Sequence, residues 1–414
     1  MSYANCWDHT RYAILVLTTF CLSLLLANSL ALNFTVICMR EEPSGGSVIR
    51  QSPAPTLNST ANTHTTHPLP RHLFSEHQER VLFSAVGVGS LIGSVPVIWL
   101  TSTLGTRWTF TLYGLLSALS TLATPLLVAV GGFIPLCVAR VLQGVALSVS
   151  FTAMGSVTST WAALKSSGVF IAYLACHLQL GPIISMPLAG VFCSSTLVTW
   201  RELYYLLVCR SPFSSLDSGS KARFKGALTL VGFTAFYFFY TDSPRDHPHV
   251  SDKEADRIEA GRDLHSERAR LPIPYRQMVV DPSVWGLVFS FFCVQLAIRL
   301  LIQYGPIYLH KVLGFSYQQT GMAASLPHMV ALVVRFAIGP LSDYAACVGE
   351  RARVVIFTSS AKLIMCVCYA ALALLPAGSH PILIQIAFSG VLVSSSLNAV
   401  GVLKSLQLVC TLSF

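Results

Sequence analysis

Long apolar runs alternate with short polar connections along almost the whole chain. Many of these runs approach the ~20 residues that a helix needs to cross a bilayer core. They cover about 12–39, 81–101, 108–130, 133–153, 168–193, 285–304, 319–338, 354–375 and 382–403. A further run, 203–240, is interrupted by the polar stretch 210–226. Its later piece, 226–240, would reach only ~22 Å as a helix, which is short of the ~30 Å core. The pattern predicts an all-α, polytopic membrane protein with one irregular span.

Composition and charge placement agree with that prediction. Hydrophobic residues make up 53% of the 414 residues and charged residues 11%, and the mean hydropathy is +0.62. The net charge of +9 does not indicate nucleic acid, because the basic residues lie in alternate connections. Arg107, Lys165, Arg351 and Arg353 occupy such connections, and seven further Lys or Arg residues lie within 245–276. These connections, and with them the amino terminus, are predicted to be cytoplasmic.

The loop 40–80 then falls on the other side of the membrane. It is rich in Ser, Thr, Pro and His and contains the sequon Asn58-Ser59-Thr60, so we expect Asn58 to be glycosylated. The twelve cysteines show no metal-ligand spacing, and we interpret them as small apolar packing residues. No metal site is predicted.

The chain divides into two halves around a polar segment. We expect an N-terminal helical bundle over 1–241, a cytoplasmic connector over 242–283 and a C-terminal bundle over 284–414. The stretch 93–107 in the first half and the stretch 339–351 in the second each contain a glycine, a short turn and an arginine. Repeated halves of this kind are typical of transporters.

These repeated stretches resemble a known loop motif. Gly339, Leu341, Ser342, Asp343 and Arg351 resemble the loop motif of the major facilitator superfamily. The copy in the first half keeps Gly105 and Arg107 but has Ser102 at the position of the acidic residue. The resemblance implies a two-bundle transporter in which Gly339, Asp343, Arg351, Gly105 and Arg107 act in gating rather than in contact with the substrate.

Longer stretches are similar to one branch of that superfamily. "ARVLQGVALSVSFTAMGSVTSTW", "YTDSPRDHPHVSDKEADRI", "YGPIYLHKVLGFSYQQTGMAASLPHMV" and "NAVGVLKSLQLV" resemble the anion–cation symporters of solute carrier family seventeen. That family includes phosphate cotransporters, sialin and vesicular glutamate transporters. The resemblance implies twelve spans, whereas this sequence ends just past the tenth. It also implies an arginine where Ala31 stands and a glutamate where Leu147 stands, so coupling through those residues cannot be transferred.

Basic and imidazole side chains lie within the predicted spans, where an ionisable group costs at least ~2.5–3.5 kcal/mol. No Asp or Glu lies deep in a span. Cations without carboxylate partners favour an anionic substrate. The candidates are Arg140, His177, Arg299, His328, Arg335, Lys362 and Lys404.

Each candidate has an alternative role. Arg140 and Arg299 are predicted to attract the anion, although Arg140 could instead contact a helix end and Arg299 could extend toward the membrane interface. Arg335 is predicted to act either in the pathway or structurally near the cytoplasmic gate, and Lys362 could extend toward the interface. His177 is predicted either to titrate near neutral pH or to hydrogen-bond within the helix packing. Lys404 and Asn398 are further candidates for substrate binding. The small residues of 87–94 and 394–401 favour close helix packing.

These observations predict secondary transport of inorganic phosphate or an organic anion by alternating access. Coupling to Na⁺ or H⁺ is implied by the resemblance, and no cofactor is expected. The chain is not predicted to be an enzyme, because the sequence contains no constellation of catalytic residues. It has no phosphate-binding glycine loop ending in Lys-Ser/Thr, so ATP is not expected to drive the cycle. We expect a monomer in the plasma membrane or an endolysosomal or vesicle membrane. The alternative is a degenerate, non-transporting paralogue that senses or binds a partner.

Overall fold

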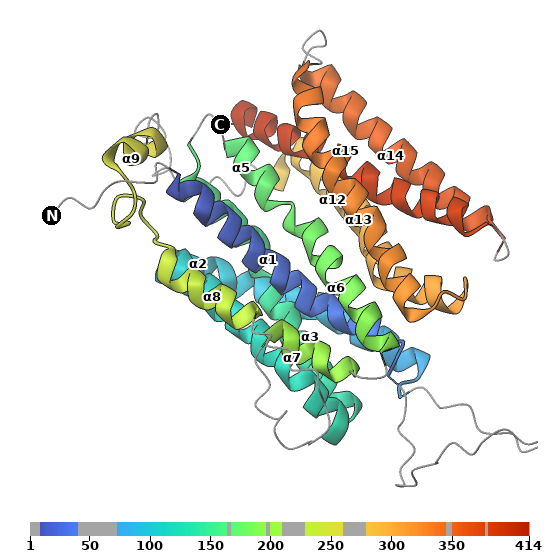
Figure 1. Cartoon of the computed structure of the whole chain (residues 1–414). Helices are drawn as coiled ribbons and strands as arrows, with labels where there is room; N and C mark the ends of the chain where they lie inside the picture. Colours follow the sequence, from blue (N-terminus) through green and yellow to red (C-terminus); the bar gives the residue numbers. More distant parts are fainter. Residues whose placement is uncertain are drawn as a thin grey trace, which may run out of the picture.

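The computed structural model describes residues 9–39, 73–163, 167–195, 199–208, 228–259, 279–344, 350–376 and 380–413, and these segments are almost entirely helical (Figure 1). The predicted all-α fold is confirmed. Asn58 and the insert 210–226 lie outside the described residues. The helices are α1 (Thr10–Thr35), α2 (Glu76–Val130), α3 (Phe133–Leu147), α4 (Val149–Trp161), α5 (Ser167–Leu174), α6 (His177–Ser194), α7 (Trp200–Val208), α8 (Leu228–Phe239), α9 (Asp252–Glu259), α12 (Pro282–Lys311), α13 (Tyr317–Tyr344), α14 (Glu350–Leu374) and α15 (Pro381–Ser413).

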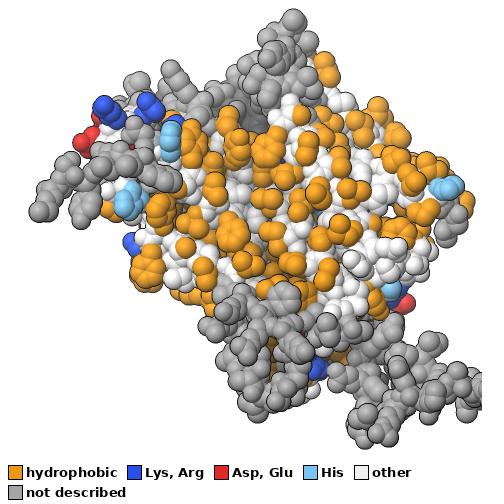
Figure 2. All heavy atoms as spheres, viewed as in Figure 1, with side chains coloured by type: hydrophobic (Ala, Val, Ile, Leu, Met, Phe, Trp, Pro, Cys, Tyr) orange, Lys and Arg blue, Asp and Glu red, His pale blue; other side chains and the backbone are white. Residues whose placement is uncertain are grey.

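The helices have the length and surface of membrane spans. Within the described residues, seven helical stretches are long and apolar enough to cross a bilayer. Figure 2 shows a broad face of hydrophobic side chains, with Lys, Arg, Asp and Glu confined to its margins. The chain is a multi-pass membrane protein.

The long helix α2 contains two predicted spans, and it reverses direction at Gly105. This glycine has a φ of +81°, and a Cβ there would meet the Asp242 carboxylate. Asp242 Oδ1 accepts hydrogen bonds from Thr106 N at 2.9 Å and Arg107 N at 3.2 Å. The carboxylate thus caps the free amides at the start of the second span. Sequence reasoning found Gly105 and Arg107 but missed Asp242.

The interrupted sixth span is formed by two short helices, α7 and α8, which follow one line in Figure 1. Thr229 Oγ1, at the start of α8, donates to Leu207 O near the end of α7 at 2.6 Å. Helix α7 has nine residues and α8 has twelve. At ~1.5 Å per residue, the two helices end to end are roughly 30 Å long. The later piece does not have to cross the membrane alone, because α7 supplies the length that the sequence-based prediction found lacking.

The two halves begin equivalent helices with the same cap. At the start of α2, Ser75 and Gln78 bond reciprocally, each side chain to the other's backbone amide. Ser316 and Gln319 do the same at the start of α13. Such a capping box satisfies two free amides. The repeat between the halves therefore extends beyond the glycine loops to the preceding helix starts.

Small residues bring α2 and α3 into close contact. A Cβ on Gly89 would collide with Val141 O, and one on Gly144 would collide with Val86 O. Ser90 Oγ also donates to Gly144 O at 3.1 Å. In the second half, Ser396 Oγ donates across to Ala331 O on α13 at 2.9 Å. The predicted close packing of 87–94 and 394–401 is confirmed at these positions.

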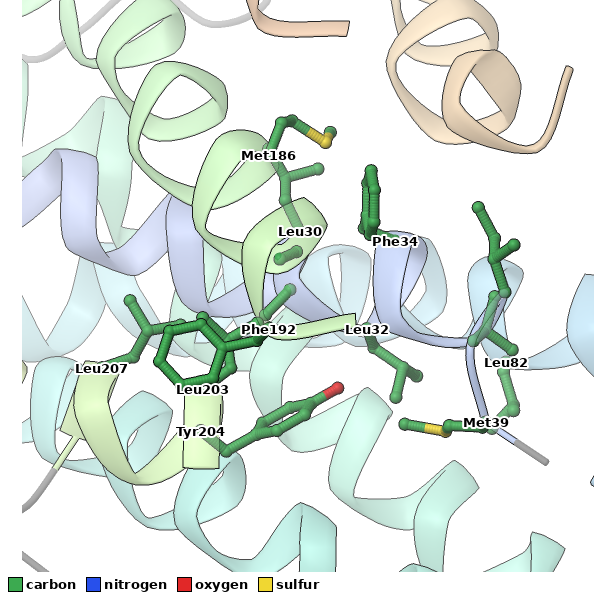
Figure 3. Close-up of a cluster of buried hydrophobic side chains, with 14 of the residues drawn as sticks. Leu30, Leu32, Phe34, Met39, Leu82, Met186, Phe192, Leu203, Tyr204 and Leu207 are labelled. Carbon is green, nitrogen blue, oxygen red and sulfur yellow. The ribbon is translucent and has the colours of Figure 1, made fainter. Parts of the chain in front are cut away.

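A hydrophobic core joins α1, α6 and α7 (Figure 3). Leu30, Phe34, Met186 and Leu203 are among its buried members. Tyr204 enters the same cluster, and its hydroxyl bonds to Thr35 Oγ1 at 2.7 Å. This hydrogen bond offsets the cost of burying the phenol hydroxyl in an apolar core.

One pair of cysteines corrects the sequence-based interpretation. Cys38, which follows α1, forms a disulfide with Cys193 on α6, although 155 positions separate them. Cys21, Cys137, Cys176, Cys293, Cys366 and Cys368 are free. Spacing could not reveal the pair, because helix packing alone brings the ends of α1 and α6 together.

Removing this disulfide is expected to lower stability by about 2–4 kcal/mol. The reason is that the bond constrains a long stretch of the unfolded chain. Thermal unfolding of Cys193→Ser, followed by tryptophan fluorescence in detergent, would measure the change. Cys366→Ser is the matched control, since Cys366 is exposed and free. Equal melting temperatures for both variants would contradict the expectation.

Candidate functional site

Two adjoining cavities lie where the helical halves meet. The central cavity has a volume of about 140 Å³ and includes Gln179, His328, Arg335 and Asn398 in its lining. The serine cavity has a volume of about 210 Å³ and is lined by His177 and by Ser90, Ser94, Ser148 and Ser150. Both cavities are lined by Leu26, Phe151, Leu178 and Arg299.

Arg299 therefore stands at the junction of the two cavities. It lies within α12, and its side chain is exposed. Among the described residues, it makes no hydrogen bond and no ion pair. No Asp or Glu from the described part of the chain lines either cavity. A guanidinium in this position carries five donors and a positive charge that the surrounding side chains leave available.

His177 lies where the fifth span breaks between α5 and α6. The amide of Leu178 bonds to Ala175 O, and His177 Nδ1 lies 2.7 Å from Leu174 O. Because a carbonyl oxygen can only accept, Nδ1 carries the proton and donates. In the neutral ring, Nε2 is therefore the nitrogen with the lone pair. Nε2 has no partner within the described part of the chain, while the side chain is 2% exposed.

Arg335 and His328 connect the two halves beside these groups. Arg335 Nη1 on α13 donates to Ala175 O, at the break in the fifth span, at 2.7 Å. His328 Nδ1 lies 2.7 Å from Gln179 Oε1 on α6. Since the amide oxygen accepts, this nitrogen is the donor. Both side chains thus have oxygen partners that belong to the other half.

Of three further predicted residues, Asn398 lines a cavity, whereas Lys362 and Arg140 do not. Asn398 lines the central cavity, and its Oδ1 is buried without a partner among the described residues. Lys362 Nζ donates to Ser290 Oγ at 2.7 Å and lines neither cavity. Arg140 is also absent from both linings.

Arg140 is held inside the first half and is 1% exposed. Its guanidinium donates to Ser29 O, Gln143 Oε1 and Asn33 Oδ1, each at 2.8 Å, and to Leu82 O at 3.3 Å. The side chains of Lys404, Gly339, Asp343 and Arg351 lie outside the described residues.

Contacts between the halves also close one face of the molecule, the face that carries Met39 and Lys311. Lys311 Nζ lies 3.8 Å from Glu79 Oε2. The rings of Phe83 and Tyr304 meet edge to face at 5.6 Å. Gly190 on α6 and Gly321 on α13 pack so closely that a Cβ on either would touch the other's Cα near 3.1–3.2 Å. The cavities are therefore separated from this face by packed side chains.

Two helical halves that enclose cavities lined by apolar residues and a few polar side chains define a multi-pass protein with the architecture of a transporter. The chain belongs to the major facilitator superfamily, whose family model matches residues 11–213 and 224–410. The family confirms the prediction of a transporter-type protein rather than an enzyme.

The curated relatives confirm the resemblance to anion–cation symporters. Sodium-dependent phosphate transport protein 1 of Mus musculus is 23% identical over 334 residues, covering 81% of this chain and 66% of the relative. Vesicular glutamate transporter 3 of Danio rerio is 25% identical over 230 residues, covering 55% and 35%. Sialin of Homo sapiens is 24% identical over 257 residues, covering 62% and 47%. The chain thus spans just under two thirds of the length of the mouse protein.

Solved structures show the same fold. The xylose transporter XylE from E. coli, in a partially occluded inward open conformation, has a TM-score of 0.62 at 13% identity. The match covers 96% of this chain and 87% of the XylE chain. A bacterial homologue of the human lysosomal transporter Spinster, in an inward-facing conformation, has a TM-score of 0.62 at 14% identity and covers 94% and 74%.

Proposed function

We propose that this protein is a secondary transporter that moves a small anion by alternating access and binds it at Arg299. The observation that carries the proposal is the position of Arg299, which lines both cavities and lacks a partner among the described residues. An anion supplies the missing negative charge, and its departure restores the free guanidinium. Asn398 and Gln179 line the central cavity beside it and can orient the solute by hydrogen bonds.

The names of the relatives suggest which anions to test. They include sodium-dependent phosphate transport proteins, a probable urate exporter, vesicular glutamate transporters and sialin. We propose phosphate or an organic anion as the solute. Coupling to Na⁺ or H⁺ is part of the same proposal.

Orientation and gating complete the proposal. Thr10 Oγ1 donates to His249 O at 2.9 Å, and Arg11 N donates to Glu254 Oε1 at 3.2 Å. The start of α1 and the segment after α8 therefore share one face, which we propose is cytoplasmic because the predicted basic connections lie there. The turn at Gly105, with its Asp242 cap, would be the gate of the first half, and Gly339, Asp343 and Arg351 would form its counterpart.

Counterflow in proteoliposomes tests the function. Vesicles containing the purified protein are loaded with unlabelled phosphate, urate, glutamate or sialic acid and then diluted into the labelled form of the same anion. Transient accumulation of at least one label above protein-free vesicles is expected. Xylose, a neutral solute, should not accumulate. Failure of all four anions to accumulate would contradict the proposal and favour the non-transporting alternative.

A further inference from the structure

We propose that His177 accepts a proton that moves together with the anion, so that the transporter is a proton–anion symporter. The inference rests on the proposed function, because it requires an anion at Arg299. It assigns the coupling to an imidazole beside the anion rather than to a membrane carboxylate. The position where the resemblance implies a glutamate is Leu147 in this chain.

The hydrogen bond to Leu174 O determines which nitrogen of His177 can take up the proton. Nδ1 already donates to this carbonyl at 2.7 Å, so Nε2 is the basic atom of the neutral ring. His177 lines the serine cavity together with Arg299, although little of its surface is exposed. His177 thus lies at the wall of a cavity, and its basic nitrogen has no partner in the described structure. This nitrogen can therefore accept a proton or a hydrogen bond from a ligand.

The charges around His177 make anion binding and protonation interdependent. Arg299 on α12 and Arg335 on α13 are the positive groups that act on it. His328, also on α13, is a further titratable side chain, and it lines the adjoining central cavity. The residues that α2, α3 and α4 contribute to the serine cavity are serines and apolar residues, and α1 contributes Leu26. With the cavities empty, the burial of His177 and, after it, the charges of the two arginines oppose a third positive charge.

An anion at Arg299 shifts this balance toward protonation. Its negative charge offsets the guanidinium and attracts the proton to Nε2, and the resulting imidazolium adds a second donor for the anion. Linkage is reciprocal, so the factor by which the anion strengthens proton binding equals the factor by which the proton strengthens anion binding. The step is a proton transfer from water to Nε2, and the same proton returns to water when the anion leaves.

The serine cavity provides the route for that proton. Ser94 Oγ donates to Leu91 O, Ser148 Oγ to Val145 O and Ser150 Oγ to Leu147 O, at 2.7–2.8 Å. Each hydroxyl proton is thus used on a helix carbonyl, and each oxygen keeps a lone pair that can accept from water. A cavity of about 210 Å³ with such a lining has the size and polarity to hold water beside Nε2.

The test compares anion exchange with gradient-driven uptake. Proteoliposomes in sodium-free buffer take up labelled urate or, separately, labelled glutamate, which both keep their charge between pH 7.0 and 8.0. The membrane potential is clamped with potassium and valinomycin. A pH gradient, acidic outside, should raise initial uptake by wild type by about fivefold or more, the lower range of allosteric coupling. His177→Gln should still exchange the anion, but more slowly than wild type because the second donor is lost, and it should show no stimulation by the gradient.

The control is His380→Gln, because His380 is exposed and lies outside both cavities, and it should respond as wild type does. A second measurement does not depend on the variant. Wild-type protein in weakly buffered detergent should take up protons when urate or glutamate is added. If the wild-type protein exchanged the anion but showed neither stimulation by the gradient nor proton uptake, the inference would be overturned and the proposed function would stand. Full stimulation in His177→Gln would overturn it as well, whereas the absence of any anion exchange would overturn both.

Discussion

Arg299→Met is expected to abolish anion counterflow while the protein remains folded. The guanidinium is the group at the junction of the two cavities to which we assign the anion. Its loss should cost about 3 kcal/mol of anion binding or more, which corresponds to at least about a hundredfold reduction in initial rate. Stability should change little, because Arg299 makes no hydrogen bond or ion pair with the described residues and its removal leaves no acceptor unpaired there.

The control for this variant is Arg201→Met. Arg201 is exposed and stacks on Trp200 with its guanidinium 5.5 Å from the ring centre, and it lines neither cavity. It should transport as wild type does. Arg299→Lys should keep part of the activity, because an ammonium retains the charge but cannot bind the anion through two nitrogens. Counterflow at the wild-type rate in Arg299→Met, with an unchanged melting temperature, would remove Arg299 from the proposal.

The sequence predicted the fold well because the length of an apolar run is a local property. A bilayer requires about 20 apolar residues per helix, and runs of that length are visible without knowledge of any contact. The all-α, multi-pass architecture follows from them. The sixth span was harder to interpret, because the end-to-end contact of Thr229 with Leu207 O depends on how α7 and α8 are brought together across an insert.

The buried cations were interpreted less accurately. Lack of a membrane carboxylate indicates a free charge only if no other oxygen is near. In the structure, Arg140 binds carbonyl and amide oxygens, Arg335 binds Ala175 O and Lys362 binds Ser290 Oγ. Such neutral partners include backbone atoms, which every residue has, so the sequence carries no signal for them. Arg299, unlike these three cations, has no partner among the described residues.

Long-range pairs were invisible for a related reason. Asp242 reaches the amides of Thr106 and Arg107 across more than 130 positions, and Cys38 pairs with Cys193 across 155. Neither partner has a local signature that distinguishes it from an ordinary loop aspartate or a packing cysteine. Only the turn at Gly105 was marked in the sequence, by its glycine and arginine.

Arg140→Met is expected to destabilise the protein strongly rather than to alter transport selectively. The substitution leaves Asn33 Oδ1 and Gln143 Oε1 without the donor that each now has, and it removes a second donor from Ser29 O and Leu82 O, which keep their helical amides. A buried acceptor that loses its partner costs about 1–3 kcal/mol, and water can reach few of these atoms because Arg140 is 1% exposed. The total should be several kcal/mol, enough to reduce the yield of folded protein.

Arg140→Lys should recover little of that stability. A lysine keeps the positive charge but lacks the planar group that donates in several directions at once. The measurements are the melting temperature and the monodisperse fraction in gel filtration. Arg80→Met is the control, because Arg80 is exposed and bonds only within its own helix, to Glu76 O at 3.2 Å among the described residues. It should stay within about 0.5 kcal/mol of wild type. If Arg140→Met were as stable as that control but lost counterflow, the buried guanidinium would have to leave its four oxygens during the transport cycle and bind the anion directly.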